Sequence, residues 1–307
     1  MEIKKGSLFL FRLFGVRVYA SWYWLPGAVV IIWYQSALSR LSGEDLSVGF
    51  FIALYLCLFL IVLIHEFGHA LACKSVGGSA REIMLWPLGG LAYVQPPQRA
   101  GAMLWSIVAG PLVNVILLPL LFVPAVLWNY MALGTWAATF LWWVAWMNLM
   151  MLGFNLLPFY PLDGGQIVRS LLWFFCGRGL SLIIAAALGL CGTVLLAVLA
   201  LFAGWAYMGL MVLFMGLQSY AGLRQGMLLL KIERTPRRAE AACPHCGQHP
   251  PRGELWRCPC GMQFDTFQNG GSCPACTRAF PATSCPFCLQ AAPLAQWYPP
   301  ETAPLGA

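Results

Sequence analysis

The fold is decided by residues 48–74, which read VGFFIALYLCLFLIVLIHEFGHALACK. Most of this stretch is apolar, over about the 20 residues that a transmembrane helix needs. His65, Glu66 and His69 stand near its end. The chain of 307 residues is 60% hydrophobic and only 9% charged, whereas about a quarter of the residues in a soluble protein are charged. These observations predict an integral membrane protein.

Six segments are long and apolar enough to span a bilayer. They cover residues 20–39, 48–74, 101–127, 135–157, 180–203 and 205–224. A shorter apolar stretch, residues 164–176, is interrupted by Arg169 and is expected to form a half-helix. The sequence therefore predicts an all-α polytopic membrane protein with about six transmembrane helices.

The basic residues of the loops give the orientation. Those expected on one side of the membrane are Lys4, Lys5, Arg12, Arg17, Lys74, Arg81, Arg99, Arg169, Arg178, Arg224, Lys231, Arg234, Arg237 and Arg238. On the opposite side, Arg40 is offset by Glu44 and Asp45. Because positive loops stay inside, both termini are expected in the cytoplasm, in a cell or inner membrane. Topology explains the net charge of +7, so no nucleic-acid partner is predicted.

Residues 81–98 break the helical pattern. Prolines and glycines exclude a long helix there, while Ile83, Leu85, Leu91, Tyr93 and Val94 suit short strands. We expect a short membrane-associated β-hairpin whose backbone polar groups are covered by protein. A plain cytoplasmic loop is the alternative.

The sequence His65-Glu66-Phe67-Gly68-His69 carries the chemistry. Four residues of helix turn about 400°, so both imidazoles project from one face. That spacing lets two nitrogens bind one Zn²⁺, with Glu66 beside the metal as a base. Ionisable groups at membrane depth are costly and mark function. The alternative is a pair of histidines that only hydrogen-bond between helices.

A catalytic zinc takes three protein ligands and keeps one position open. The third ligand must be acidic, because no other histidine precedes residue 243. Glu82 lies beyond the helix among basic residues, which leaves Asp163. It follows a helix broken by prolines and glycines in the stretch NLLPFYPLDGG, residues 155–165. Asp163 could instead, or as well, cap the following half-helix.

Three motifs together resemble the signatures of the site-2 protease family of intramembrane metalloproteases. They are His65–His69, Gly110–Asn114 and Asn155–Gly164, and the resemblance covers roughly residues 10–225. It implies zinc held by His65, His69 and Asp163, with Glu66 activating water, and cleavage of membrane-tethered proteins that are often regulators of transcription. The segment with Gly89 and Gly90 is similar to the family's membrane-associated strand, which is thought to pair with an unwound substrate.

Two asparagines have an open role. Asn114 and Asn155 are uncharged donors at membrane depth. They can stabilise the oxyanion or orient the substrate backbone. Hydrogen bonding between helices explains them equally well.

The tail holds eight cysteines in four pairs. They are Cys243, Cys246, Cys258, Cys260, Cys273, Cys276, Cys285 and Cys288. Eight thiolates suit two structural Cys₄ zinc sites, and a reducing cytoplasm disfavours disulfides. The tail is similar to zinc-ribbon modules, and which pairs share an ion stays open. A regulatory protein is a possible partner of this cytoplasmic tail.

The expected organisation has five parts. They are a cytoplasmic or interfacial segment (1–19), a metalloprotease core (20–225), a basic connector (226–242), a zinc-binding tail (243–290) and a disordered end (291–307). The predicted function is intramembrane peptide-bond hydrolysis of membrane-embedded protein substrates. The alternatives are a catalytically silent membrane scaffold that recruits partners through its tail, and a zinc transporter or sensor.

Overall fold

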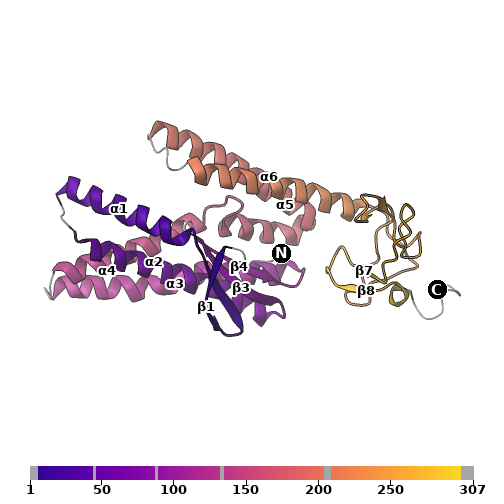
Figure 1. Ribbon diagram of the computed structural model, residues 1–307, viewed down its shortest axis with the longest axis horizontal. Helices are drawn as coiled ribbons and strands as arrows, with labels where there is room; N and C mark the ends of the chain where they lie inside the picture. The colour runs from indigo at the N-terminus through magenta and orange to yellow at the C-terminus, as the bar shows by residue number, and fades with distance from the viewer. Residues whose placement is uncertain (1–5, 44–45, 87–88, 132–134, 204–208, 299–307) are drawn as a thin grey trace. The chain divides into compact units, whose positions relative to one another are not determined.

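The computed structural model describes residues 6–43, 46–86, 89–131, 135–203 and 209–298 (Figure 1). Its helices are α1 (Trp24–Ser42), α2 (Val48–Ser75), α3 (Ala100–Tyr130), α4 (Thr135–Asn155), α5 (Asp163–Phe202) and α6 (Gly209–Arg234). The chain forms two compact units, one of residues 1–176 and 184–222, the other of residues 177–183 and 223–307.

Four of the described helices are long and apolar enough to cross a membrane. They are α2, α3, α4 and α5. Each of the six segments expected to span the bilayer is mostly helical, but α1 and α6 are less apolar. The fold is therefore mostly helical, with four candidate spans and small β-sheets.

Helix α5 is two helices joined at a sharp break. Gly177 has φ 81° and ψ 172°, a conformation that favours glycine. The part before the break matches the expected half-helix. After the break, the carboxylate of Glu233 accepts the backbone N–H of Gly179 at 3.2 Å. This bond satisfies one of the amides that a helix start leaves unpaired.

A four-stranded sheet stands beside the helices in the first unit. Its order is β1 (Ser7–Leu13), β2 (Val16–Ser21), β3 (Ser79–Trp86) and β4 (Gly89–Gln95). Strands β3 and β4 are antiparallel and form the expected hairpin, rather than a plain loop. Strand β4 is one edge of the sheet.

Strands β1 and β2 were not expected. They form a second antiparallel hairpin, and β2 runs parallel to β3. The two-residue turn at Phe14 and Gly15 has positive φ at both positions, which suits a tight hairpin. Helix α1 accordingly begins at Trp24 rather than near residue 20.

The sheet packs on the part of α2 that carries the histidines. The shared core consists of Val16, Val18, Leu63, Phe67, Ala70, Ala80, Ile83 and Leu85. Its members on α2 alternate with His65, Glu66 and His69 along the chain. This apolar contact therefore fixes the position of the sheet along α2, beside the histidines.

The second unit is a small cysteine-rich fold. Two short hairpins, β5 (Trp256–Arg257) with β6 (Gln263–Phe264) and β7 (Ala282–Ser284) with β8 (Ala291–Pro293), are followed by the 3₁₀ helix η2 (Leu294–Trp297). Residues 291–298 were expected to be disordered, yet they fold because Trp297 is buried against Phe267. The Trp297 ring supplies a core contact, whereas the proline content of this stretch had suggested disorder.

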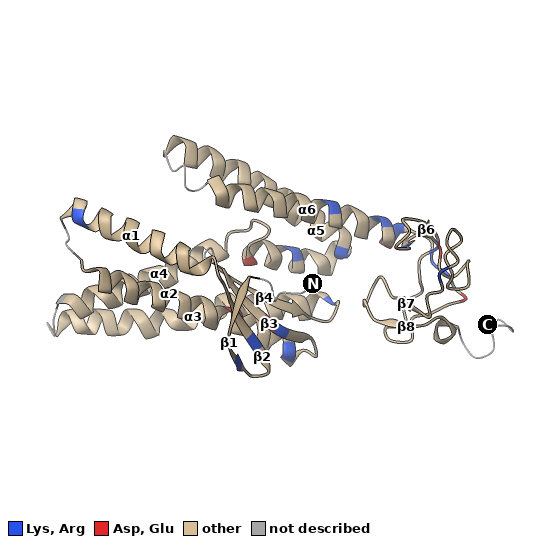
Figure 2. Cartoon of the chain, in the orientation of Figure 1, with Lys and Arg blue, Asp and Glu red and all other residues tan. Residues whose placement is uncertain are grey.

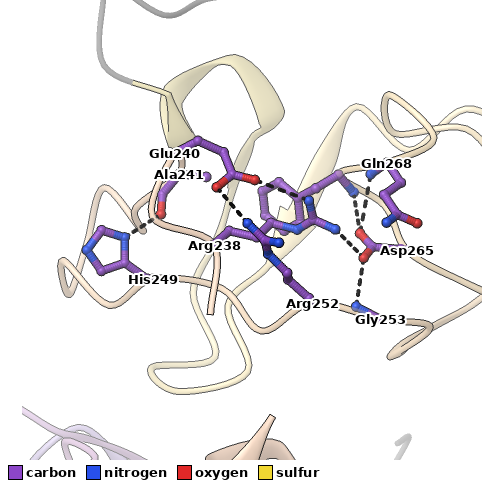
Figure 3. Close-up of polar contacts among 9 residues, drawn as sticks. Arg238, Glu240, Ala241, His249, Arg252, Gly253, Asp265 and Gln268 are labelled. Atoms are coloured by element: carbon purple, nitrogen blue, oxygen red, sulfur yellow. Dashed lines mark hydrogen bonds and ion pairs between the residues drawn. The ribbon is translucent and has the colours of Figure 1, made fainter. Parts of the chain in front are cut away.

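The expected basic connector is divided between two structures. Helix α6 continues to Arg234, whereas Arg238 is buried in the tail. Figure 3 shows Arg238 between the carboxylates of Glu240 and Asp265. Asp265 also accepts the backbone N–H of Gly253 at 2.8 Å. Arg238 thus anchors the tail instead of belonging to a solvated linker.

Candidate functional site

Helix α2 carries two imidazoles on one face, and α3 crosses directly beside them. A Cβ added at Gly68 would come within 2.7 Å of the Ala109 carbonyl oxygen. A Cβ at Gly110 would meet the rings of both His65 and His69. The two glycines therefore permit the close contact of α2 and α3 that the site requires.

Asp163 begins α5 and faces the two histidines. Its Oδ2 lies 3.1 Å from His65 Nε2 and 3.4 Å from His69 Nε2, and the two nitrogens are 3.1 Å apart. Leu162, not Asp163, is the N-cap residue of α5. The structure thus brings together the three ligands expected from the sequence.

Hydrogen bonds at the far side of each ring fix its tautomer. His65 Nδ1 lies 2.7 Å from Asn114 Oδ1, and His69 Nδ1 lies 2.9 Å from the Ser106 carbonyl oxygen. Both partners are acceptors, so each Nδ1 carries a proton, and in the neutral ring each Nε2 then offers a lone pair. Such partners hold ligating histidines in metal sites.

The three ligand atoms fit a zinc ion. Asp163 Oδ2 is buried and has no hydrogen-bond partner among the described residues. When both rings are neutral, three lone pairs face one another, and a bound cation removes their repulsion. For metal–ligand bonds of about 2.0–2.1 Å, tetrahedral geometry places ligand atoms about 3.3 Å apart. The observed separations of 3.1–3.4 Å match this value.

Glu66 is buried beside the cluster and bound to the edge of the sheet. Its Oε2 accepts the backbone N–H of Ala92 in β4 at 2.8 Å. A Cβ at Gly90 would collide with the Glu66 side chain, lying 2.7 Å from Oε1. Strand β4 therefore covers Glu66, and Gly90 is required by this contact. Figure 2 shows few other charged residues along α2, α3 and α4.

The two expected asparagines have different surroundings. Asn114 is fully buried and holds His65, while its Nδ2 has no partner among the described residues. Asn155 is half-buried, and its side chain makes no hydrogen bond to any described residue. The structure brings Asn114 to the metal ligands and gives Asn155 no comparable contact.

Sequence reasoning missed the residues that hold the loop before Asp163. The hydroxyl of Ser219 in α6 donates to the Tyr160 carbonyl at 2.6 Å. A Cβ at Gly189 in α5 would collide with this same carbonyl. No motif indicated these positions, and their only sequence signal is a small residue on an apolar helix.

The tail brings its cysteines into two nested clusters. Cys243, Cys246, Cys285 and Cys288 form one, and Cys258, Cys260, Cys273 and Cys276 form the other. Paired sulfurs lie 3.5–3.8 Å apart, too far for disulfides. Zinc–sulfur bonds of about 2.3 Å give a tetrahedral separation of about 3.8 Å. The clusters therefore fit metal ions.

Backbone groups also stabilise thiolate in the tail. Burial by itself raises the pKa of the Cys273 thiol. Hydrogen bonds from the backbone N–H groups of Cys276 and Ala275, together with those from the Cys258 and Cys260 side chains, lower this pKa to about 7. A thiolate is the form of cysteine that binds metal.

Comparison with known proteins places this arrangement in a family. The model of peptidase family M50 matches residues 53–138 and 123–199. A zinc metalloprotease of Methanocaldococcus jannaschii is 31% identical over 227 residues, 74% of this chain and 62% of that protein. Stage IV sporulation protein FB of Bacillus subtilis is 30% identical over 142 residues, 45% of this chain and 44% of that protein. The chain thus spans less than two thirds of either relative.

A solved structure has the same fold. The site-2 protease from Methanocaldococcus jannaschii aligns with a TM-score of 0.54 and 28% identity. The alignment covers 71% of this chain and 95% of that one.

Proposed function

The chain belongs to peptidase family M50, the site-2 protease family, and on this premise we propose that it is an intramembrane zinc metalloprotease. Its substrates are membrane-tethered proteins, regulators among them, cut within or near a transmembrane segment. One observation carries the proposal: three lone pairs converge within 3.1–3.4 Å beside a buried carboxylate. A silent scaffold has no need of that carboxylate.

His65, His69 and Asp163 hold the catalytic zinc. When bound there, Zn²⁺ polarises the scissile carbonyl and makes water acidic enough to attack near neutral pH. Asn114 and the Ser106 carbonyl keep the two rings oriented toward the metal. The unpartnered Nδ2 of Asn114 is a buried donor, which suits stabilisation of the oxyanion. Asn155 remains a candidate for orienting the substrate backbone.

Glu66 is the general base and later the general acid. Its Oε2 is held by the N–H of Ala92, and Oε1 accepts no hydrogen bond from the described residues. Glu66 takes a proton from the attacking water and returns it to the leaving amine. The hydrogen bond from Ala92 keeps the carboxylate in place for both transfers.

Strand β4 receives the unwound substrate. It is an edge strand, and its outward N–H at Ala92 already points at Glu66. A substrate segment that pairs with this edge passes next to the catalytic carboxylate. Gly89 and Gly90 lie in this strand, and a Cβ at Gly89 would meet no described atom within 4 Å, which leaves room for that approach.

The tail binds two structural zinc ions, one in each cluster. Both chain termini lie in the cytoplasm, α1 and α6 cross the membrane with the other four helices, and the tail is the surface for a regulatory protein. These assignments rest on the distribution of basic residues and on the cysteine geometry.

The test uses purified wild-type chain and Glu66→Gln with a model transmembrane substrate. We expect the variant to retain zinc and to cleave about 100-fold to 10,000-fold more slowly, because the amide cannot take a proton. Glu82→Gln is the matched control, since Glu82 pairs with Arg17 away from the cluster. Equal cleavage by wild type and Glu66→Gln would refute the proposal.

A further inference from the structure

Asn148 is a fully buried polar residue that belongs to none of the three motifs. It lies on α4, and its Nδ2 donates to the backbone carbonyl of Asn114 on α3 at 3.0 Å. Burying an amide side chain is costly unless its hydrogen bonds repay the lost hydration. The Oδ1 atom of Asn148 has no partner among the described residues. The bond to the Asn114 carbonyl is therefore the described interaction that offsets the cost of burying this side chain.

The receiving carbonyl belongs to the residue that orients His65. Asn114 presents Oδ1 to His65 Nδ1 at 2.7 Å. If its amide were reversed, Nδ2 would face the ring, and the ring proton would move to Nε2. A protonated Nε2 cannot bind a metal, so the position and orientation of Asn114 decide whether His65 is a ligand.

Prolines interrupt the hydrogen-bond ladder of helix α3 near this turn. It contains prolines at positions 111, 119 and 124. Pro119 has no N–H for the carbonyl of Val115 and crowds the turn that follows Asn114. A bond from the neighbouring helix therefore supplies support that the interrupted ladder of α3 lacks.

We propose that Asn148 is a positioning residue of the metal centre. It fixes the Asn114 turn through the backbone carbonyl, Asn114 then fixes the tautomer and direction of His65, and His65 presents Nε2 to the metal. This inference rests on the proposed role of His65 as a zinc ligand. Asn148 touches neither substrate nor metal, so it acts only through Asn114.

The experiment measures zinc affinity of the full-length chain by competition with a chelator. The difference in bound zinc between wild type and His65→Ala is the zinc held at the histidine site. This difference distinguishes it from the zinc held by the tail. Asn148→Leu should weaken this site by about tenfold, the low end of the cost of losing a direct partner of a ligating histidine, because Asn148 acts one contact further out. Val144→Ala, one turn earlier on α4 and also buried, should lower thermal stability without changing zinc affinity.

A double-mutant cycle tests whether the effect passes through Asn114. Asn114→Leu with Asn148→Leu should bind zinc no more weakly than Asn114→Leu by itself. Additive losses, or an affinity of Asn148→Leu within twofold of wild type, would overturn the inference. If Asn148→Leu does not fold, Asn148→Ala removes the donor without placing a larger apolar branch in the site and must show the same loss. No zinc difference between His65→Ala and wild type would instead refute the proposed metal site.

Discussion

At the scale of single residues, the site depends on glycines, which have no side chain, as much as on the residues that carry its chemistry. Gly110 leaves room for both imidazoles, and Gly90 leaves room for Glu66. Protein interiors are packed so closely that one methyl group changes such contacts. Substitution of Gly110 should therefore affect the metal site, and substitution of Gly90 should affect the base.

Gly110→Ala should remove zinc from the histidine site. The new methyl group meets His69 and lies 2.9 Å from His65 Nε2, so the rings must move apart. We expect cleavage to fall about 100-fold, as for other displacements near 1 Å. Zinc content and cleavage rate are the measurements. Gly101→Ala on the same helix, whose Cβ meets only Phe174 at 3.8 Å, should leave both unchanged.

Gly90→Ala should slow the reaction and leave zinc in place. The three atoms nearest to its methyl group all belong to Glu66, so we expect the base to be the group displaced. We expect kcat to fall by about 100-fold or more. Gly153→Ala, which has open space around it, serves as the control. Loss of zinc from Gly90→Ala would show that the assigned contact is wrong.

The spacing of His65 and His69 was enough to predict that they share a face, because helix geometry alone decides it. Asp163 followed from the scarcity of acidic residues in apolar segments. Asn148 could not be predicted, because its role depends on a contact between two helices whose packing no local pattern encodes. The zinc itself stays a prediction.

At the scale of elements, the position of Asp163 depends on helices far from it in sequence. The loop of residues 156–162 rests on small residues of α5 and α6. Ser219 holds the Tyr160 carbonyl, and Gly189 allows its approach. The late helices therefore act as a platform for the third metal ligand.

Gly189→Ala should reduce activity although Gly189 follows Asp163 by seven turns of helix. Its methyl group displaces the Tyr160 carbonyl, and the loop moves Asp163 away from the histidines. We expect a loss between about tenfold and 100-fold in kcat/KM. Gly209→Ala, whose Cβ would meet no atom of the described residues within 4 Å, is the matched control. An unchanged rate for Gly189→Ala would mean that the loop is held elsewhere.

The elements were predictable to different degrees. Long apolar runs predicted the helices, because a helix satisfies its own backbone hydrogen bonds inside the bilayer and few other structures do. Glycines and prolines gave the hairpin of β3 and β4. The hairpin of β1 and β2 was not predicted, because residues 8–11 form a continuous apolar run rather than the alternating pattern of a half-buried strand. The cysteine pairing was open because nested and sequential arrangements have the same spacing.

At the scale of the whole molecule, the chain combines a membrane unit and a cysteine-rich unit. The cysteine-rich unit includes the end of α6 from Leu223 onward and the short stretch of α5 from Gly177 to Ile183. Within it, Arg178 donates to the Phe287 carbonyl at 3.5 Å, and Arg237 lies over the Phe287 ring. Phe287 lies between two cysteines of one cluster, so metal loss there should also disturb the helix end.

Cys285→Ser should therefore lower the zinc content and unfold part of the tail. A fold this small has too little core without metal, so zinc binding and folding are coupled. We expect about one zinc fewer per chain. We also expect an added protease to cut the chain on the C-terminal side of Arg234 sooner than it cuts the wild type. Cys191→Ser is the control, because Cys191 is exposed and belongs to neither cluster. Full zinc content in Cys285→Ser would contradict the assignment.

The most direct test of the central claim is anomalous diffraction at the zinc edge from crystals of the full chain. The account predicts a peak between His65, His69 and Asp163, about 2.0–2.2 Å from each ligand atom. The absence of a peak there, in crystals that show zinc in the cysteine clusters, would contradict it.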